Sequence, residues 1–232
     1  MNYQFSYLIG DLTILIIWFV LFFWRKDTRK EMLSISLIFG LAGLIVEFIY
    51  TIDWWHPLTI TNTLIGIEDF IFGFAVGGVA SIIYLQVFKK RLKIKKADKK
   101  TEDKKNINFL IIISTLLALF LGSFFVLKFN SFYSSIIAFT IPTLIIWFKR
   151  KDLILDSIAS GFILMVTSFL FFIIPELITP GWVNSAWFIE NLSGIIILKV
   201  PLEDIIWFFL AGAFIGPLYE YWQEGKLINL KN

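Results

Sequence analysis

The chain has 232 residues, enough for one or two ordinary soluble domains, but its composition excludes a soluble fold. Apolar residues make up 58% of the sequence and charged residues 17%, below the roughly 25% charged residues of soluble proteins. The mean hydropathy is +0.79. A chain of this size has too little interior to bury so much apolar surface, so the composition predicts a protein of the lipid bilayer. With no cysteine and one histidine, the sequence excludes disulfides and thiol chemistry and argues against a histidine-based metal site.

Seven segments are long and apolar enough to cross a bilayer, which takes about 20 residues per helix. They cover residues 3–24, 32–52, 66–88, 107–127, 130–148, 153–174 and 202–222. The first of them lacks the basic start and the small-residue cleavage site of a signal peptide. We therefore expect an all-α fold, a polytopic membrane protein with seven transmembrane helices.

Basic residues are distributed unevenly between the loops that these spans define. Of the 21 Lys and Arg residues, all but Lys128 and Lys199 fall on one side. The positive-inside rule then predicts a multi-pass protein of the cell membrane with its N-terminus outside and its C-terminus in the cytoplasm. The basic run Lys89–Lys105 is most simply a solvated cytoplasmic linker that fixes this topology, although such runs also bind nucleic acid or anionic lipid. We expect membrane lipids around the protein and no nucleic-acid partner.

Two stretches of the sequence, residues 64–84 and 199–219, resemble each other. Aligning Glu68-Asp69 with Glu203-Asp204 also pairs Gly77 with Gly212 and Tyr84 with Tyr219. An Ile-Ile-Trp-Phe string and an Arg-Lys-Asp string precede each acidic pair. The pattern predicts an internal duplication.

The duplication predicts the domain organisation. Residues 1–90 form one three-helix repeat, residues 91–128 a basic cytoplasmic loop plus a linker transmembrane helix, and residues 129–232 a second three-helix repeat. Without the added helix the second unit would be inverted, so the linker helix makes the two repeats parallel, related by an axis along the membrane normal. A functional site is expected between the halves.

Carboxylates within or near the spans are the residues that point to chemistry. They are Asp11, Glu47, Glu68, Asp69, Asp156, Glu203 and Asp204. Ionisable groups in a bilayer are costly and usually functional. A buried carboxyl group tends to stay protonated and can act as a general acid, while a second one in a more polar place can act as a base. Neighbouring residues on a helix point about 100° apart, so one member of each Glu-Asp pair is enough to reach a shared cavity.

Structural roles are the alternative for several of these residues. Pro201 followed by two acids is also an ordinary first turn of a helix. We expect Asp156 to be interfacial and both Glu176 and Glu190 to be solvated in an outer segment, residues 175–200.

Other features indicate packing. His56 stands beside Trp54 and Trp55, as in an aromatic belt at the outer interface. The pairs Gly73/Gly77 and Gly212/Gly216 have the four-residue spacing that lets helices approach closely. The chain contains no G-x-G-x-x-G and no P-loop, and no D-x-x-x-D within a span, so we expect no nucleotide, flavin, metal or other cofactor.

The string Pro201-Leu202-Glu203-Asp204, followed by an aromatic-rich helix, resembles the P-x-E-[ED] motif of the membrane-embedded lycopene cyclase domain. That domain occurs as small three-span heterodimer subunits in bacteria and as fused pairs in archaea and fungi. Two repeats and a linking helix resemble the fused form. The first repeat departs from the motif, because Gly66 stands where the family has proline.

The resemblance implies a lycopene beta-cyclase-like isomerase, an intramolecular lyase of carotenoid biosynthesis, acting on a lipid-soluble polyene without a cofactor. It implies that Glu203 and Asp204 are catalytic, with Glu68 and Asp69 as their equivalents in the first repeat and Glu47 as a further acid. It also implies substrate contacts from Pro201, Trp207 and Phe208.

Three alternatives stay open. One is another isoprenoid-modifying membrane enzyme on the same scaffold. The second is a proton-coupled small-molecule transporter or channel, which parallel repeats and intramembrane acids also fit. The third is a non-catalytic membrane scaffold. The sequence leaves the oligomeric state, the ring type and the division of roles between acid and base undetermined.

Overall fold

A computed structural model describes residues 2–94 and 98–230 of the chain. Three basic residues of the predicted cytoplasmic side, Lys95, Lys96 and Lys231, lie outside the described residues. Within the described part, seven helical segments are long and apolar enough to cross a membrane, and the seventh, Leu202–Gln223, consists of two consecutive helices. The prediction of an all-α, polytopic membrane protein is confirmed.

The helices in chain order are α1 (Ser6–Trp24), α2 (Arg29–Asp53), α3 (Ile67–Val87), α4 (Lys99–Leu121), α5 (Ser131–Lys149), α6 (Ile154–Ile178), α7 (Trp182–Ala186), α8 (Leu202–Ile215) and α9 (Leu218–Gln223). The strands are β1 (Lys90–Lys93), β2 (Ile196–Ile197), β3 (Val200–Pro201) and β4 (Lys226–Asn229). Short 3₁₀ turns cover Lys26–Thr28, Lys151–Leu153 and Ile189–Asn191, and α4 continues into a π-helical turn, Gly122–Val126.

Three helices extend beyond the predicted spans. α2 begins at Arg29, α4 at Lys99, and α6 continues to Ile178. Hydropathy detects where the apolar stretch begins, whereas a helix continues into polar sequence until a capping residue ends it. Asp98 is such a cap for α4: hydrogen bonds from Thr101 hold the pKa of Asp98 below its usual range.

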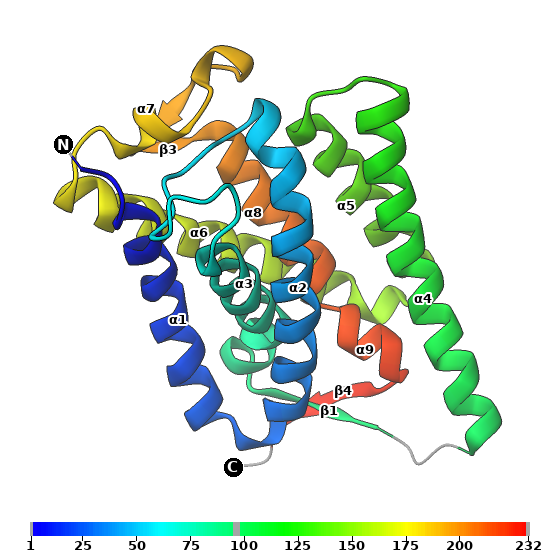
Figure 1. Ribbon diagram of the computed structural model, residues 1–232. Coiled ribbons are helices and arrows are strands. Elements are labelled where there is room, and N and C mark those ends of the chain that lie inside the picture. Colours follow the sequence, from blue (N-terminus) through cyan, green and yellow to red (C-terminus); the bar gives the residue numbers. More distant parts are fainter. Residues whose placement is uncertain (1, 95–97, 231–232) are drawn as a thin grey trace.

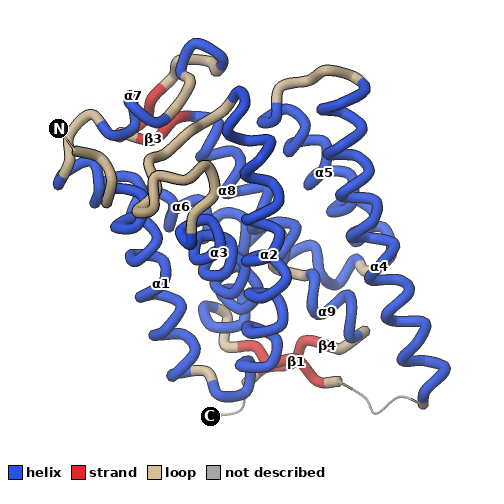
Figure 2. Tube along the Cα trace, in the orientation of Figure 1, coloured by secondary structure: helices blue, strands red, loops and turns tan. Residues whose placement is uncertain are grey.

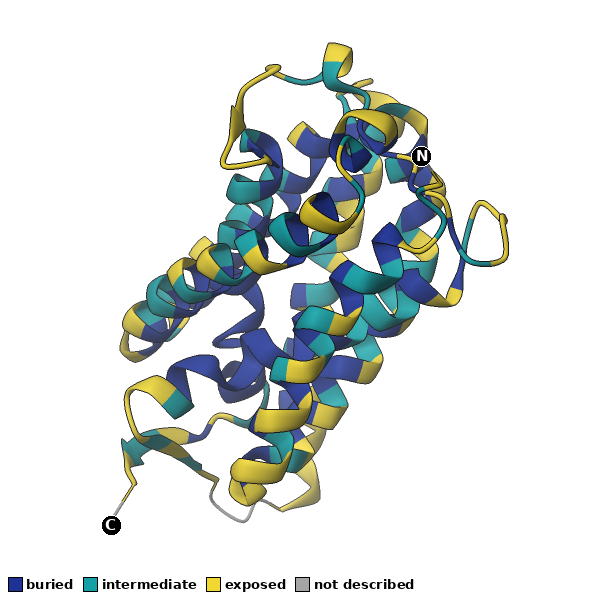
Figure 3. Cartoon of the chain, turned by 90° about the vertical axis from the view of Figure 1, so that its left-hand side faces the viewer, coloured by how far each residue is buried: buried dark blue, intermediate teal, exposed yellow. Residues whose placement is uncertain are grey.

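The long helices form one bundle, and the loops gather at its two ends (Figures 1 and 2). We name the end that holds α7 and β3 the α7 end. At the opposite end β1 pairs antiparallel with β4, with Lys90 opposite Asn229 and Lys93 opposite Lys226, and we name it the ribbon end. Outward faces of the helices are exposed and inward faces are buried (Figure 3), as expected for helices surrounded by lipid.

Glycines allow two helix pairs, α2 with α3 and α6 with α8, to pack closely. A Cβ added to Gly73 would collide with the Phe39 carbonyl on α2. One added to Gly212 would lie 2.7 Å from the Ser160 carbonyl on α6. The packing role predicted for these glycines is therefore confirmed.

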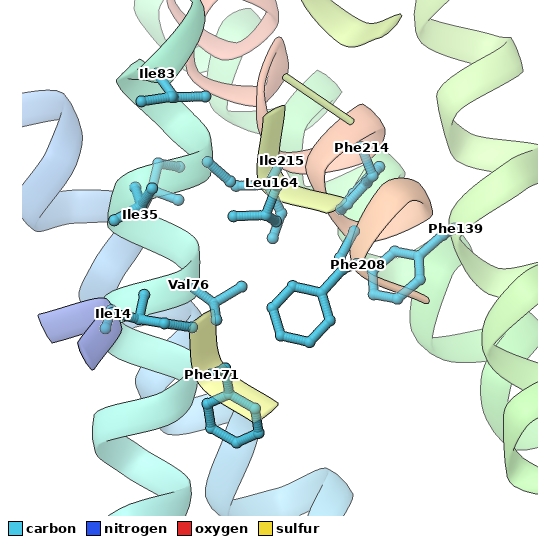
Figure 4. Close-up of a cluster of buried hydrophobic side chains, with 14 of the residues drawn as sticks. Ile14, Ile35, Val76, Ile83, Phe139, Leu164, Phe171, Phe208, Phe214 and Ile215 are labelled. Carbon is cyan, nitrogen blue, oxygen red and sulfur yellow. The ribbon is translucent and has the colours of Figure 1, made fainter. Parts of the chain in front are cut away.

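Between these pairs lies a hydrophobic core to which both halves contribute. Ile14, Val76, Phe171 and Phe208 come from α1, α3, α6 and α8, and their side chains gather in one cluster (Figure 4). Each is at most 2% exposed. The core therefore joins the two halves into a single packed unit.

Two Arg-x-Asp turns at the ribbon end make matched contacts. In each, the arginine Nε donates to the aspartate two residues later, at 2.9 Å for Arg25 and 2.8 Å for Arg150. The guanidinium of Arg25 donates to the carbonyls of Leu85 and Lys90, and that of Arg150 to those of Glu220 and Gly225. Leu85 and Glu220 are 135 residues apart in the sequence, and so are Lys90 and Gly225. The aligned acids Glu68 and Glu203 have the same separation. These contacts support the duplication as a proposal.

The helix ends align the first helices of the two halves in one register, and the Ile-Ile-Trp-Phe strings align them in another. α1 ends directly before Arg25 and α5 directly before Arg150. Trp18 then lies nearly two turns from the end of its helix, buried, with its indole N–H donating to Ser36 Oγ at 2.8 Å. Trp147 lies in the last turn and is partly exposed. The two tryptophans are therefore not equivalent.

Candidate functional site

Two adjoining cavities lie toward the α7 end, between the two halves of the chain. The larger has a volume of about 110 Å³ and the smaller about 30 Å³. Both are lined by Tyr50, Trp55, Phe72 and Trp207. These four side chains form a shared wall, so the two cavities belong to one site.

The larger cavity is apolar except for a few groups contributed by four helices. The polar lining residues are Tyr7, Glu47, Tyr50, Asp69 and Ser135. The remaining lining is largely aliphatic and aromatic, from α2 to α5 and α8. Such a cavity suits an apolar ligand that meets carboxyl groups at one place.

In each predicted Glu-Asp pair, the two side chains point in different directions from their helix. Asp69 lines the larger cavity and Asp204 the smaller. Glu68 and Glu203 line neither of these cavities and point toward the loops before their helices. The division follows from the angle of about 100° between neighbouring side chains on a helix.

Asp69 is held by two hydrogen bonds. Tyr7 Oη donates to its Oδ1 at 3.0 Å, and the backbone N–H of Gly66 donates to its Oδ2 at 2.7 Å. The second bond also caps the start of α3. Donors of this kind stabilise a carboxylate, so Asp69 has the environment of a base.

Glu47 lines the same cavity from α2 and is 3% exposed. Its Oε1 accepts no hydrogen bond from the described residues, and the Trp55 indole lies beside the carboxyl group. A buried carboxyl group with few donors around it has the environment of an acid that keeps its proton.

Asp204 lies in a chamber of aromatic rings. The smaller cavity is lined by Tyr50, Trp54, Trp55, Phe72, Phe171, Trp187, Asp204, Trp207 and Phe208. The indoles of Trp54 and Trp187 lie close to the carboxyl group. Asp204 Oδ2 accepts no hydrogen bond within the described part of the chain. Aromatic faces around a carboxyl group form a region that favours a positive charge.

Glu68 and Glu203 fix the loops at the α7 end. Glu68 Oε1 accepts from the backbone N–H of Ile60 at 2.6 Å. Glu203 Oε1 accepts from the backbone N–H of Ser193 at 2.7 Å. Their matched bonds indicate a role in positioning the loops that close the site.

Two of the three predicted substrate-contact residues line the site. Trp207 lines both cavities and Phe208 the smaller one. Pro201 lines neither of them; it is buried in β3 and directly precedes α8. The Trp207 indole donates to Tyr50 Oη at 3.3 Å, which lies 3.0 Å from Ser135 Oγ, so a polar chain fixes the ring that separates the cavities.

Two acids are more buried than expected. Asp156 lies in the first turn of α6, near the end of its span, but is 1% exposed, because the following residues pack against α8. Glu176, expected in solvent, is 8% exposed, because its carboxyl group accepts from the backbone N–H groups of Gly181 and Val183. The expectation of a solvated Glu176 was wrong, whereas Glu190 is exposed as expected.

A second group of acids, at the ribbon end, escaped the sequence analysis. Glu31 and Glu220 are 4% and 0% exposed and lie close to each other and to Asp156. Glu31 lay outside the predicted second span and Glu220 at the margin of the seventh. This group does not line the two cavities.

Aromatic residues of the site were also missed. Trp54 and Trp55, expected in an interfacial belt with His56, are 3% and 6% exposed and line the site. Tyr7 and Trp187 were not singled out, although both are buried. Composition alone does not distinguish lipid-facing from inward-facing aromatic residues. Contact with a buried acid identifies the inward-facing ones.

Comparison with known proteins bears on the second half of the chain. Residues 130–222 match the family model described as lycopene cyclase, which confirms the predicted resemblance to that family. The match runs from the start of α5 into α9 and contains the motif Pro201-Leu202-Glu203-Asp204. No curated protein and no solved structure matches the chain.

Proposed function

We propose that this protein is a carotenoid lycopene cyclase that closes rings at the ends of lycopene within the membrane. The observation that carries the proposal is the pair Glu47 and Asp69, two buried carboxyl groups from different helices that face one apolar cavity. The family match of residues 130–222 supports the same function.

The reaction needs two proton transfers and no oxidant. A proton adds to the terminal C=C bond, which forms a C–H bond and leaves a carbocation. The electron pair of a neighbouring double bond attacks that carbon, forms the ring C–C bond and moves the positive charge into the ring. Loss of an adjacent proton to a base restores a C=C bond, so the product is an isomer of the substrate.

The surroundings of each acid suggest its role. Glu47, with few donors around it, supplies the proton, and Asp69, with two donors, accepts one. General acid–base groups of this kind typically contribute about 10² to 10⁴ in rate. The aromatic side chains that line both cavities, among them Trp55, Phe72 and Trp207, stabilise the carbocation between the two steps. Glu68 and Glu203 keep the loops in place.

The proposed location is the cell membrane, with the α7 end outside. The loops at the ribbon end carry most of the basic residues, whereas Lys128 and Lys199 lie in loops at the α7 end. The positive-inside rule then puts the ribbon end in the cytoplasm.

Pigment analysis in lycopene-accumulating cells tests the proposal. Cells that express the wild-type chain should contain a monocyclic or bicyclic carotene, and cells that express Asp69→Asn should retain lycopene. Glu68→Gln is the matched control, because it changes the neighbouring acid outside the cavity and keeps a carbonyl acceptor for Ile60. Unchanged lycopene with wild-type protein folded in the membrane would contradict the proposal and favour another isoprenoid or a transport function.

A further inference from the structure

The larger cavity reaches the lipid-facing side of the bundle between α2 and α4. Leu117 of α4 lines the cavity and is also 43% exposed. Across from it, Ala42 and Val46 of α2 line the cavity and are partly exposed. A side chain can do both where a cavity meets the surface, and the outward surface of α4 faces lipid in a spanning helix.

α4 is attached firmly at the ribbon end. There Lys105 Nζ donates to the carbonyl of Gln223 at 2.7 Å, and the Trp222 indole donates to Asn106 Oδ1 at 2.8 Å. The Phe109 and Trp222 rings stack with centroids 4.3 Å apart. This end of α4 is therefore fixed to α9.

The contact between α4 and α2 is of a different kind. Within the described residues, no hydrogen bond or ion pair joins the two helices. Phe120 meets the edge of Tyr50, with ring centroids 5.8 Å apart, and packs near Ile49. Apolar contacts without directional bonds can separate and close again at low cost in lipid.

The helical geometry of α4 also changes beside the cavity. After Leu121 the helix becomes a π-helical turn, Gly122–Val126, and a Cβ added at Gly122 would meet no atom within 4 Å. This turn ends the helix, directly before the loop that leads to α5. The π-helical turn begins about one and a half helical turns after Leu117.

We propose that a linear hydrocarbon chain enters the larger cavity sideways from the bilayer, between α2 and α4, with its end group first. The lipid-side opening is formed by Ala42, Val46, Leu116 and Leu117. The end group then reaches Glu47 and Asp69 while the rest of the chain stays in lipid. Such a route never exposes the chain to water, which would oppose transfer of apolar surface. The identity of the chain as lycopene rests on the proposed function; the opening itself does not.

The absence of native cysteine makes a single introduced cysteine a specific probe. Leu117→Cys places a thiol at the opening. Leu110→Cys is the matched control, because Leu110 lies two turns away on the same face of α4, is 59% exposed and does not line the cavity. Membranes containing either variant are treated with a bulky, lipid-soluble maleimide.

We expect modification of Leu117→Cys to lower lycopene conversion at least about tenfold, because the adduct occupies the route to a site that must enclose the end group. Modification of Leu110→Cys should leave conversion unchanged. Ala42→Cys, on the opposite wall, repeats the test should Leu117→Cys fail to fold.

A second measurement does not depend on turnover. Lycopene in the vesicles should slow the reaction of Leu117→Cys with the maleimide and leave that of Leu110→Cys unaltered. Protection without conversion supports the opening and contradicts the proposed reaction. Conversion that persists after modification, together with no protection, overturns the opening.

Discussion

The two halves of this chain share their packing and differ in their chemistry. Arg25 and Arg150 make the same contacts at the ribbon end, and Glu68 and Glu203 hold the preceding loops alike. Asp69, in contrast, faces a cavity with a second acid, whereas Asp204 faces aromatic rings. The contacts that hold the fold together are therefore alike in the two halves, while the surroundings of the reacting groups differ.

One backbone atom accounts for part of this difference. Asp69 Oδ2 accepts from the N–H of Gly66. The aligned residue in the second half is Pro201, which has no N–H, and Asp204 Oδ2 accepts no bond from the described residues. The departure of Gly66 from the family motif thus has a consequence, since it gives the first-half aspartate one more hydrogen bond.

The largest expected effect comes from changing the two aspartates separately. We expect Asp69→Asn to lower lycopene conversion by about 10² to 10⁴, because it removes the proton acceptor. Asp204→Asn should lower conversion by about tenfold, because it changes the group around which the indoles of Trp54 and Trp187 are arranged beside the shared aromatic wall. Pigment chromatography of expressing cells measures both, with Glu203→Gln as a control expected to retain activity. The reverse order of effects would place the proton transfers in the second half.

The matched arginines should differ in stability. Arg25 is 4% exposed, and Arg25→Ala leaves the buried carbonyl of Leu85 without its donor, so we expect a loss of about 3 kcal/mol in the free energy of unfolding. Arg150 is more exposed, and Arg150→Ala should cost about 1 kcal/mol. Reversible unfolding in mixed micelles measures the two losses. Equal losses of unfolding free energy in the two variants would show that the greater burial of Arg25 does not make its contacts more stabilising than those of Arg150.

Packing at the aligned glycines should be similar in the two halves. We expect Gly77→Ala and Gly212→Ala each to cost about 1 to 3 kcal/mol. Gly212 should lie at the higher value, because its Cβ would meet backbone atoms of α6, whereas Gly77 would meet the Phe39 side chain first. The same unfolding assay serves, with Gly122→Ala as the control that has open space. A loss at Gly122 as large as the other two would contradict the packing argument.

The smallest expected effect is that of Pro201→Ala. The substitution restores an N–H before α8 and should lower stability by no more than about 1 kcal/mol through backbone entropy. The new N–H is placed to donate to Asp204, as Gly66 donates to Asp69. The N–H stretching frequency of the isotope-labelled Ala at position 201 should be lower than in the double variant that also carries Asp204→Ala, because the hydrogen bond to the carboxyl group weakens the N–H bond. Equal frequencies in the two variants would mean that Pro201 does not cause the difference between the two aspartates.

The sequence predicts the spans and the acid pairs well, for a physical reason. Long apolar segments and carboxylates within them are local features, and both follow from the cost of polar groups in lipid. The structure adds which member of each pair turns inward: Asp69 and Asp204, with Glu68 and Glu203 directed to loops.

Residues that depend on tertiary contacts could not be predicted. Tyr7 is recognisable as a site residue through Asp69, from which it is far in sequence. Glu176 is buried because the chain turns back over it after α6. Glu31 and Glu220 come together because α2 and α9 meet at the ribbon end. No local pattern encodes these meetings.

The β1–β4 ribbon has a consequence for biogenesis. β1 emerges from the ribosome before α4, yet its partner β4 follows α9. During synthesis the edge of β1 therefore stays unpaired while four further spans are inserted, and the carbonyl of Gly225 that Arg150 binds does not yet exist. Pairing of β1 with β4 must come after insertion of the last helix. A nascent chain halted before β4 would therefore have its spans in the membrane while β1 still lacked its partner strand.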